Sequence, residues 1–398
     1  MKNVINVQNR VLDMGLGTLK TDCFSAMYPW LNENIIQMPI RSSRAGDMHE
    51  VLDFKTHITN PYRRCVGGYG RNINIFFLIA EAVWIFSGRK DVNFLTMFNA
   101  RMSDFSDDGK VFHAPYGHRM RHWGIRAEDK YVEENMHASH GYDQTVDALR
   151  LLQENPETRQ VVLQIWNPEF DLGMKSKDLP CNDMVMLKIR DGKLIATVQN
   201  RSNDLHWGLP TNIFQFSFLT ECLAACLGIS LGTQTHNSHS LHIYTWNDVA
   251  HIMSDRLNSR SEELDLYDVS EARPMDFNFV SSVAVNRLRE IDIYFSHFIR
   301  NLTNIHNGVA VNRDEIDAMK EFSGWLYRAY ELCSMYLEYK RDIKAVPAEE
   351  KDELRMSYIN RVGIMCGEKK GWDIEVLAKN FYATRLTNGI DHRYLGKL

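Results

Sequence analysis

The sequence predicts an α+β fold, in which a large mixed or antiparallel sheet is packed by helices and followed by a helical carboxyl-terminal extension. Strand-like segments occur between residues 156 and 200. Apolar helical segments flank them on both sides, and beyond about residue 283 the chain is mostly helical in character. We therefore expect a first domain over residues 1–283 and an extension over residues 284–398.

Composition indicates a globular chain. Hydrophobic residues make up 44% and aromatic residues 11% of 398 residues, enough for a large core. Lys and Arg number 46 against 51 Asp and Glu, which gives a formal charge of −5. No long basic stripe is present, so direct DNA binding is not expected. An anionic ligand would have to be bound by a local arginine cluster.

Three features predict the compartment. The longest apolar stretch, residues 73–86, is interrupted by Asn74 and Glu81, and it is shorter than the roughly 20 residues that a membrane helix needs. The amino-terminal residues lack a secretory or transit pattern, so a cytoplasmic location is expected. Seven cysteines without paired short spacings favour neither a disulfide framework nor a metal site.

The amino-terminal half begins with mixed character. Residues 1–70 combine short apolar runs with Arg, Gly, Pro and Asn, and we predict loops and strands there. Residues 73–88 are apolar nearly all round, which predicts a helix packed on every side and ended by Gly88. Glu81 falls in the middle of this helix.

The central pattern changes to strands over residues 160–166, 184–190 and 193–199. Asp191-Gly192 between the last two is a strong hairpin signal, and the flanking residues alternate between apolar and charged. Residues 212–227 return to helical periodicity and end at Gly228, a natural helix cap. Cys222 and Cys226 in this helix are expected in the core.

The extension contains a long helical segment over residues 312–344. An apolar stripe runs along it, and such a stripe is either a cofactor or partner site or an internal packing face. We predict the packing face on general grounds. The stripe consists of Trp325, Leu326, Tyr330, Leu332 and Tyr336.

Cys181 and the segment from Gln199 to Asn212 carry the chemistry. A thiol is followed there by a guanidinium, a hydroxyl, a carboxylate and a carboxamide. A cysteine attacks as its thiolate, which positive charge favours, and Arg201 is the nearest candidate. The alternative is that Cys181 is a buried small hydrophobic residue, as most free cysteines are.

Four strings in order closely resemble the thymidylate synthase family. They are Pro180-Cys181, Arg201-Ser202-Asn203-Asp204, Gly208-Leu-Pro-Thr-Asn212 and His242-Ile-Tyr244. Weaker similarity includes residues 80–84, 115–117 and 158–159, so the resemblance covers about residues 40–250. It implies that the first domain is a catalytic domain with the thymidylate synthase-like fold.

The resemblance implies a one-carbon transfer from 5,10-methylenetetrahydrofolate to C5 of a pyrimidine nucleotide. Cys181 matches the nucleophile that adds to C6, and Glu81 matches the general acid and base. For Glu81 the alternative is a buried carboxylate satisfied by its neighbours. The remaining residues implied in catalysis are Asp204, Asn212 and Tyr116.

The substrate phosphate needs permanently charged planar donors. Arg201 with Ser202 and Arg44 match the family's phosphate-binding positions. Arg159 matches an arginine that the partner subunit donates, so a homodimer is implied. A second partner arginine is Gln160 here, and Arg63, Arg64 or Arg71 is a candidate replacement. The other implied substrate-binding residues are Asn200, Asn212, His242 and Tyr244.

The base and the folate are assigned by the same resemblance. A carboxamide at Asn212 can accept from the uracil N3–H while it donates to O4, so uracil is preferred over cytosine. The residues implied in folate binding are Asp204, Gly208, Phe105 and Trp207.

Departures from the family concern the product. Hydride transfer to the bound intermediate gives a methyl group, and water gives a hydroxymethyl group. Two shielding tryptophans of the family fall at Met102 and Phe105, and the histidine after the nucleophile is Asn182. These changes and the long extension resemble the phage-type nucleotide hydroxymethylases, which would act in the cytoplasm of a bacterial host.

We therefore expect hydroxymethylation of dUMP. The alternatives are reductive methylation to dTMP and hydroxymethylation of dCMP or CMP. Two non-enzymatic alternatives are a nucleotide- or RNA-binding regulator that has this fold and a structural subunit of a larger complex.

Overall fold

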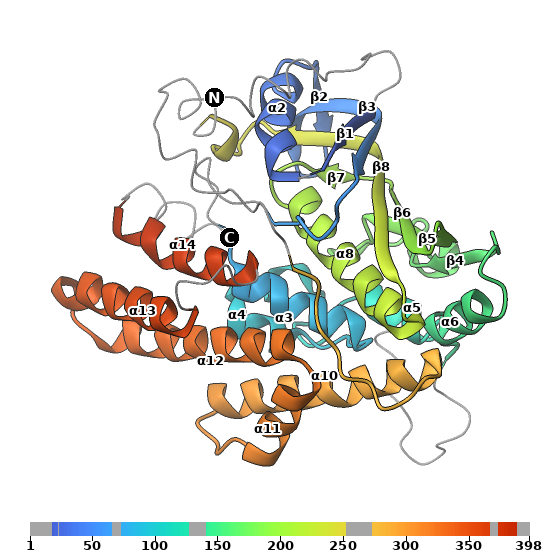
Figure 1. Ribbon diagram of the computed structural model, residues 1–398. Coiled ribbons are helices and arrows are strands. Elements are labelled where there is room, and N and C mark those ends of the chain that lie inside the picture. Colours follow the sequence, from blue (N-terminus) through green and yellow to red (C-terminus); the bar gives the residue numbers. More distant parts are fainter. Residues whose placement is uncertain are drawn as a thin grey trace. The chain divides into compact units, whose positions relative to one another are not determined.

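The computed structural model describes residues 18–22, 24–65, 73–126, 141–251, 273–366 and 373–387. The chain forms two compact units, each built from segments distant in sequence (Figure 1). Unit 1 consists of Met1–Arg71, Leu151–Trp166 and Pro180–Ala272. Unit 2 consists of Asn72–Arg150, Asn167–Leu179 and Arg273–Leu398. The predicted domain boundary at residue 283 stays a prediction, although a helix begins at Ala284.

Unit 1 contains a mixed sheet of eight strands within the described residues, in the order β1-β3-β8-β6-β5-β4 (Figure 1). In addition, β2 pairs with β3, and β7 pairs with β8. The pairs β1·β3, β6·β8 and β7·β8 are parallel, and the others are antiparallel. The predicted mixed sheet is thereby confirmed. The strands are β1 (Thr18–Thr21), β2 (Ile40–Ser43), β3 (Gly46–Ile58), β4 (Val161–Gln164), β5 (Asn182–Arg190), β6 (Lys193–Asn200), β7 (Asn203–Asp204) and β8 (Ser230–Tyr244).

The hairpin between β5 and β6 follows its sequence signal. Asp191 and Gly192 have φ values of 52° and 67°, the left-handed pair that a two-residue turn of this twist requires. At the other end of the hairpin, Asn182 pairs with Asn200 and Met184 with Gln199. Asp183 is therefore an extra residue in β5, and such a bulge re-aims the neighbouring side chains.

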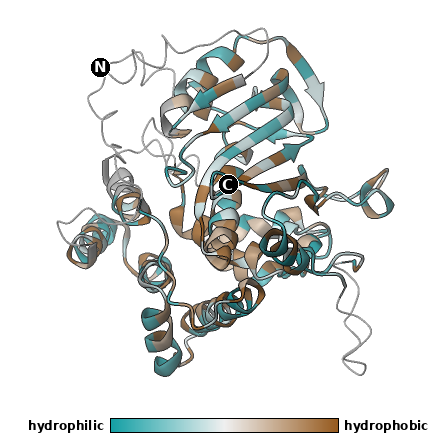
Figure 2. Cartoon of the chain, turned by 45° about the vertical axis from the view of Figure 1, so that its right-hand side comes forward, coloured by the Kyte–Doolittle hydropathy of each residue, from teal (hydrophilic) through white to brown (hydrophobic). Residues whose placement is uncertain are grey.

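Helix α8 (Gly208–Leu227) forms the core of unit 1, where it packs against β6, β7 and β8. It begins four residues before the predicted start. Pro210 does not prevent this, because it lies in the first turn, where a missing N–H breaks no helical hydrogen bond. Gly228 ends it with φ 71°, as predicted. Cys222 and Cys226 are buried, also as predicted. Figure 2 shows both apolar and polar residues along the strands.

The prediction of only loops and strands over residues 1–70 was wrong for one segment. Residues Phe24–Ile35 form helix α2, which contains Pro29. An interior proline costs a helix about 3 kcal/mol, because it removes one backbone hydrogen bond and crowds the preceding turn. Burying one large apolar side chain stabilises by about 1.5–3 kcal/mol, so a buried face outweighs the proline. That face consists of Phe24, Met27, Tyr28, Leu31 and Ile35.

Unit 2 is organised around helix α3 (Ile75–Phe86). Asn74 caps it by accepting a hydrogen bond from the Phe77 N–H at 3.1 Å, and ten of its twelve residues are buried. Gly88 follows the helix with φ 66°, so the predicted all-round helix and its stop are confirmed. Helices α4, α5, α12 and α14 pack against α3. The elements of this unit include α4 (Val92–Phe98), η2 (Ala100–Phe105), α5 (Tyr116–Arg121), α7 (Pro168–Asp171), α10 (Ala284–His306), α11 (Arg313–Phe322), α12 (Gly324–Ala345), η4 (Ala348–Glu350), α13 (Lys351–Cys366) and α14 (Asp373–Thr387), and α6 (Gln144–Glu154) crosses the division at residue 150.

The predicted helical segment 312–344 is divided into α11 and α12. Ser323 separates them, and its Oγ caps α12 by accepting from the Leu326 N–H at 3.0 Å. All five residues of the apolar stripe are buried. Within this unit Tyr336 stacks on Phe76, with ring centroids 4.5 Å apart. The stripe is a packing face, as predicted.

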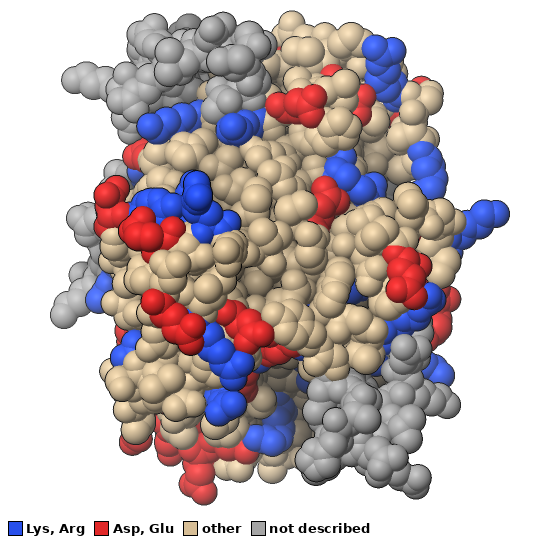
Figure 3. Space-filling view, turned by 90° about the vertical axis from the view of Figure 1, so that its right-hand side faces the viewer, with Lys and Arg blue, Asp and Glu red and all other residues tan. Residues whose placement is uncertain are grey.

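Surface charge is mixed on the face shown in Figure 3, where basic and acidic side chains lie interspersed. Among the helices in the described ranges, none combines the length and the apolar character needed to cross a membrane.

Candidate active site

Cys181 lies directly before β5 and is only partly buried. The other described free cysteines, Cys65, Cys222, Cys226 and Cys333, are all buried. The Cys181 carbonyl accepts a hydrogen bond from the Arg201 N–H at 3.0 Å, which joins the two predicted motifs through the backbone. This exposure separates Cys181 from the cysteines that only fill the core.

Arg201 is held beside Cys181 by two further contacts. Its Nε–H donates to the Pro180 carbonyl at 2.8 Å, and its guanidinium lies 5.5 Å from the centroid of the Trp166 ring. A guanidinium is a planar and permanently charged donor, which suits the binding of an anion. Ser202 follows it and is half-buried. Sequence reasoning missed Trp166, whose contact with Arg201 depends on the sheet.

Asp204, His242 and Tyr244 meet where β7 runs beside β8. Asp204 is the register partner of His242, and the rings of His242 and Tyr244 lie 5.0 Å apart. Burial raises the pKa of Tyr244, as do the charges of Asp204 and Cys181, while Ser43 and Arg44 oppose the shift. Each of these four groups therefore lies close enough to Tyr244 to affect its ionisation.

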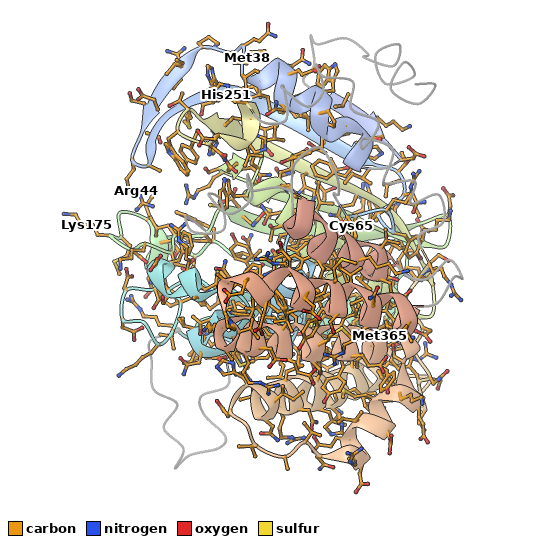
Figure 4. All side chains as sticks on the ribbon, turned by 90° about the vertical axis from the view of Figure 1, so that its left-hand side faces the viewer. Met38, Arg44, Cys65, Lys175, His251 and Met365 are labelled. Atoms are coloured by element: carbon orange, nitrogen blue, oxygen red, sulfur yellow. The ribbon has the colours of Figure 1, made fainter. Side chains whose placement is uncertain are left out.

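His242 of this ring pair is buried, whereas Arg44 is exposed. Burial lowers the pKa of His242, against weaker opposing effects of the Ser240 backbone and Glu50, so the imidazole is neutral at pH 7. Arg44, labelled in Figure 4, lies in the exposed turn between β2 and β3. An exposed turn leaves this guanidinium accessible to a ligand.

Asn212 is buried at the start of α8 and belongs to a series of side-chain hydrogen bonds, here named the carboxamide chain. Asn182 Nδ2 donates to Asn212 Oδ1 at 3.2 Å, and Asn212 Nδ2 donates to Asn203 Oδ1 at 3.2 Å. Asn203 Nδ2 then donates to Ser238 Oγ at 3.1 Å. The sequence identified Asn212 but not Asn203 or Ser238 as its neighbours.

Asp183, the extra residue of the β5 bulge, is a second site residue that the sequence did not reveal. Burial raises its pKa to about 6, although the charges of Arg201 and His239 oppose the shift. Asp183 directly follows Asn182, at which the sequence departs from the family pattern. A carboxyl group whose pKa is near neutral pH is a candidate for proton transfer at this position.

The residues expected to bind folate in unit 1 lie on one short segment. Asp204 Oδ1 accepts hydrogen bonds from the backbone N–H groups of His206 and Trp207, which fixes the turn into α8. A Cβ added at Gly208 would lie 2.9 Å from Asn203 Oδ1, so only glycine leaves this carboxamide in place.

The other expected site residues differ in burial and belong to both units. Asn200 is buried, and its Nδ2 donates to the carbonyls of Val198 and Asn237, so the backbone already uses that amide nitrogen. Arg159 is exposed just before β4. In unit 2, Glu81 is half-buried in the middle of α3, Tyr116 is the first residue of α5, and Phe105 ends η2 with 51% of its surface exposed.

Comparison with known proteins agrees with these motifs. A model of the family described as thymidylate synthase matches residues 70–286. A deoxyuridylate hydroxymethyltransferase of Bacillus phage SP01 is 40% identical over 218 residues, covering 54% of this chain and 55% of that protein. Proteins of the same description from Pseudomonas phage M6 and Delftia phage PhiW-14 are 36% and 27% identical over 207 and 274 residues.

Coverage of these relatives is partial. The Pseudomonas phage match covers 51% of this chain and 54% of that protein, and the Delftia phage match covers 66% and 70%. The chain thus spans about half the length of the first two relatives.

Proposed function

The chain belongs to the thymidylate synthase family, and from this premise we propose that it transfers a one-carbon unit to C5 of dUMP and releases 5-hydroxymethyl-dUMP. One observation carries the proposal: the partly exposed Cys181 is joined to Arg201 by a backbone hydrogen bond, and the next residue, Asn182, belongs to the carboxamide chain that contains Asn212. A nucleophile, a phosphate-binding group and a base-reading group are therefore within one unit.

The covalent step follows from these groups. The Cys181 thiolate forms a bond to C6 of the pyrimidine, and the electron pair of the C5–C6 double bond moves to make an enolate at O4. The Asn212 Nδ2–H donates to O4 and stabilises that negative charge. C5 of the enolate forms a bond to the one-carbon unit, and loss of the C5 proton gives an exocyclic C5–CH2 double bond as the bond from this carbon to the folate nitrogen breaks. Water then adds to the exocyclic carbon and gives up a proton, so that the enolate forms again. Collapse of this enolate restores the C5–C6 double bond and expels the Cys181 thiolate. Arg201, Ser202 and Arg44 hold the phosphate throughout.

Proton transfer and folate binding complete the proposal. Glu81 is proposed to move protons between O4 and water. Methylenetetrahydrofolate supplies the one-carbon unit when bound. The residues proposed to hold it are Asp204, Trp207, Gly208 and Phe105, with Tyr116 as a further catalytic residue.

The descriptions of the relatives and the presence of Asn182 both support the hydroxymethyl product. Three phage relatives are described as deoxyuridylate hydroxymethyltransferases. Asn182 adds a buried carboxamide beside Cys181, and its Oδ1 accepts no hydrogen bond within the described part of the chain. Such an acceptor supports a water molecule as the group that attacks the exocyclic carbon. Reductive methylation to dTMP is the second candidate, which the family description favours.

The assembly and location are part of the same proposal. We expect a homodimer in which Arg159 serves the partner's phosphate site, and its exposed position before β4 supports this role. The phage origin of the relatives supports the bacterial cytoplasm as the place of action.

A turnover assay tests the proposal. The purified chain is incubated with dUMP and methylenetetrahydrofolate, and the products are resolved by mass. We expect 5-hydroxymethyl-dUMP with tetrahydrofolate. Formation of dTMP with dihydrofolate would establish the second candidate instead, and nucleotide binding without turnover would favour a regulator.

Cysteine variants test the nucleophile in the same assay. Cys181→Ala should abolish turnover, by at least about 10⁴-fold, because no covalent adduct can form. It should still bind dUMP. Cys226→Ala is the matched control, since this cysteine is buried in α8 and is expected to leave turnover intact. Full activity of Cys181→Ala would refute the mechanism.

A further inference from the structure

The carboxamide chain joins three buried amides in series, and each amide donates to the next. Asn182, Asn212 and Asn203 are 0%, 5% and 1% exposed. The chain ends at Ser238 Oγ, which accepts from Asn203 at 3.1 Å. Because each amide has one donating and one accepting end, such a series has a direction, and reversing it requires all three amides to turn.

The direction of the chain determines what Asn212 offers to a base. A carboxamide has two lone pairs on oxygen and two hydrogens on nitrogen. Asn182 uses one lone pair of Asn212 Oδ1, and Asn203 uses one hydrogen of Asn212 Nδ2. One acceptor and one donor remain, in an order that suits the N3–H and O4 of uracil. Turning Asn212 by 180° would exchange them and suit N3 and the N4 amino group of cytosine.

The hydrogen bonds at the two ends favour the observed direction. Asn182 now uses a donor within the chain, and only its Oδ1 accepts no hydrogen bond from the described residues. In the reverse direction its Oδ1 would be used and its Nδ2, with two hydrogens, would lose its partner in the chain. A buried donor without a partner is costly. Ser238 permits both directions, because a hydroxyl both donates and accepts.

We propose that Asn182 and Asn203 are positioning residues that fix the orientation of the Asn212 carboxamide and thereby make the site select uracil over cytosine. This inference rests on the proposed function, and it adds two residues that do not touch the base to the determinants of base choice. It also explains why residue 208 is glycine, since a Cβ there would displace Asn203 Oδ1.

Two substitutions, each of which replaces an asparagine by an aspartate, distinguish the two directions of the carboxamide chain. In Asn182→Asp, an ionised carboxylate can only accept, so Asn212 must donate to it and turn to the cytosine-reading orientation. Asn203 then turns as well, and its Oδ1 accepts from the Ser238 hydroxyl. In Asn203→Asp, the carboxylate accepts from Asn212 Nδ2 as Asn203 Oδ1 does now. The second variant therefore keeps the uracil-reading orientation.

The test measures dissociation constants of the full chain for dUMP and dCMP at pH 8 by calorimetry, with turnover on both nucleotides. We expect wild type and Asn203→Asp to prefer dUMP. The dUMP preference of Asn182→Asp should fall by at least about 100-fold, because the wrong edge leaves buried groups unpaired. Equal preferences in the two variants would overturn the inference.

A neutral variant keeps the inference testable if Asn182→Asp does not fold. Asn182→Ala removes the donor without adding charge, so Asn212 is free to turn and the preference should fall by at least about 10-fold. An unchanged preference would overturn the inference. Asn32→Ala is the control, because Asn32 is a buried carboxamide of the same unit that donates to the Ala250 carbonyl instead. It should leave the preference unchanged.

The outcome distinguishes this inference from the proposed function. If wild type binds neither nucleotide, the proposed function fails and the inference fails with it. If wild type binds and converts dUMP but Asn182→Ala and Asn182→Asp retain its full preference, only the role of Asn182 is refuted.

Discussion

The two units each contain a buried polar cluster, and the clusters differ in kind. The carboxamide chain of unit 1 is neutral. The charged cluster of unit 2 consists of His113, Arg119 and Asp171, all at most 6% exposed. Asp171 accepts from His113 Nε2 at 3.0 Å, from Arg119 Nη2 at 2.8 Å and from the Asn167 N–H at 2.8 Å.

The difference concerns how many arrangements each cluster permits. A carboxylate only accepts and a guanidinium only donates, so the charged cluster has one arrangement. Burial alone would raise the pKa of Asp171, but the hydrogen bonds from His113 and Asn167 and the charge of Arg119 hold it below its ordinary value. Amides permit two directions. Charged groups thus suit a fixed scaffold, and amides suit a choice between two bases.

The largest expected effect comes from breaking the charged cluster. Arg119→Met should lower the free energy of unfolding by about 3–5 kcal/mol, because Asp171 stays buried without its main partner. Arg101→Met is the matched control, since Arg101 forms an ion pair with Asp104 at 40% and 63% side-chain exposure. It should change stability by less than about 1 kcal/mol. Urea unfolding measures both, and equal losses would contradict the distinction.

The next largest effect is expected for alanine substitution at Gly117, compared with the same substitution at Gly208. A Cβ at Gly117 would lie 1.8 Å from the Ile85 carbonyl oxygen, whereas the atom nearest to a Cβ at Gly208 would be the side-chain oxygen of Asn203, at 2.9 Å. Gly117→Ala should cost about 3 kcal/mol or more, because the backbone of α3 cannot move aside. Gly208→Ala should cost less than about 1.5 kcal/mol.

Nucleotide binding provides the second measurement on this pair. Gly208→Ala should reduce the preference for dUMP over dCMP, because Asn203 is displaced from the carboxamide chain. A stability loss at Gly208 as large as that at Gly117, with the base preference intact, would count against the proposed role of Asn203.

The last comparison concerns how stability depends on pH. Burial raises the pKa of Asp178 from 3.8 to about 7, against opposing effects of the Ala114 N–H, His113 and Arg119. The folded state therefore holds this proton more tightly than the unfolded state, and stability falls as pH rises from about 4 to 7. Asp178→Asn keeps an acceptor for the Ala114 N–H and removes the charge. Its melting temperature should exceed that of wild type at pH 8, with the gap closing toward pH 4.

Asp108, an exposed aspartate of the same unit, is expected to change stability with pH in the opposite direction. Hydrogen bonds from the Val111 and Lys110 N–H groups hold the pKa of Asp108 below its ordinary value. Its contribution to stability is present at neutral pH and lost as pH falls, so Asp108→Asn should melt lower than wild type at pH 7. The two variants shifting in the same direction at neutral pH would show that these local causes do not govern stability.

Local patterns in the sequence determined the elements that local interactions build. The helix around Glu81, the hairpin at Asp191-Gly192 and the end of α8 at Gly228 follow from hydrophobic periodicity and turn residues. The motif order from Cys181 to Tyr244 likewise required only the sequence, and the family match confirms the resemblance it suggested.

Tertiary structure alone decided which polar groups meet. Asn182 follows Cys181 on β5, Asn203 lies on β7, and Ser238 lies on β8, so their hydrogen bonds depend on the bulge at Asp183 and on the strand register. Helix α2 also required burial of one face to outweigh its proline. The partner of an amide is set by register between distant strands, a long-range property that no local pattern of residues encodes.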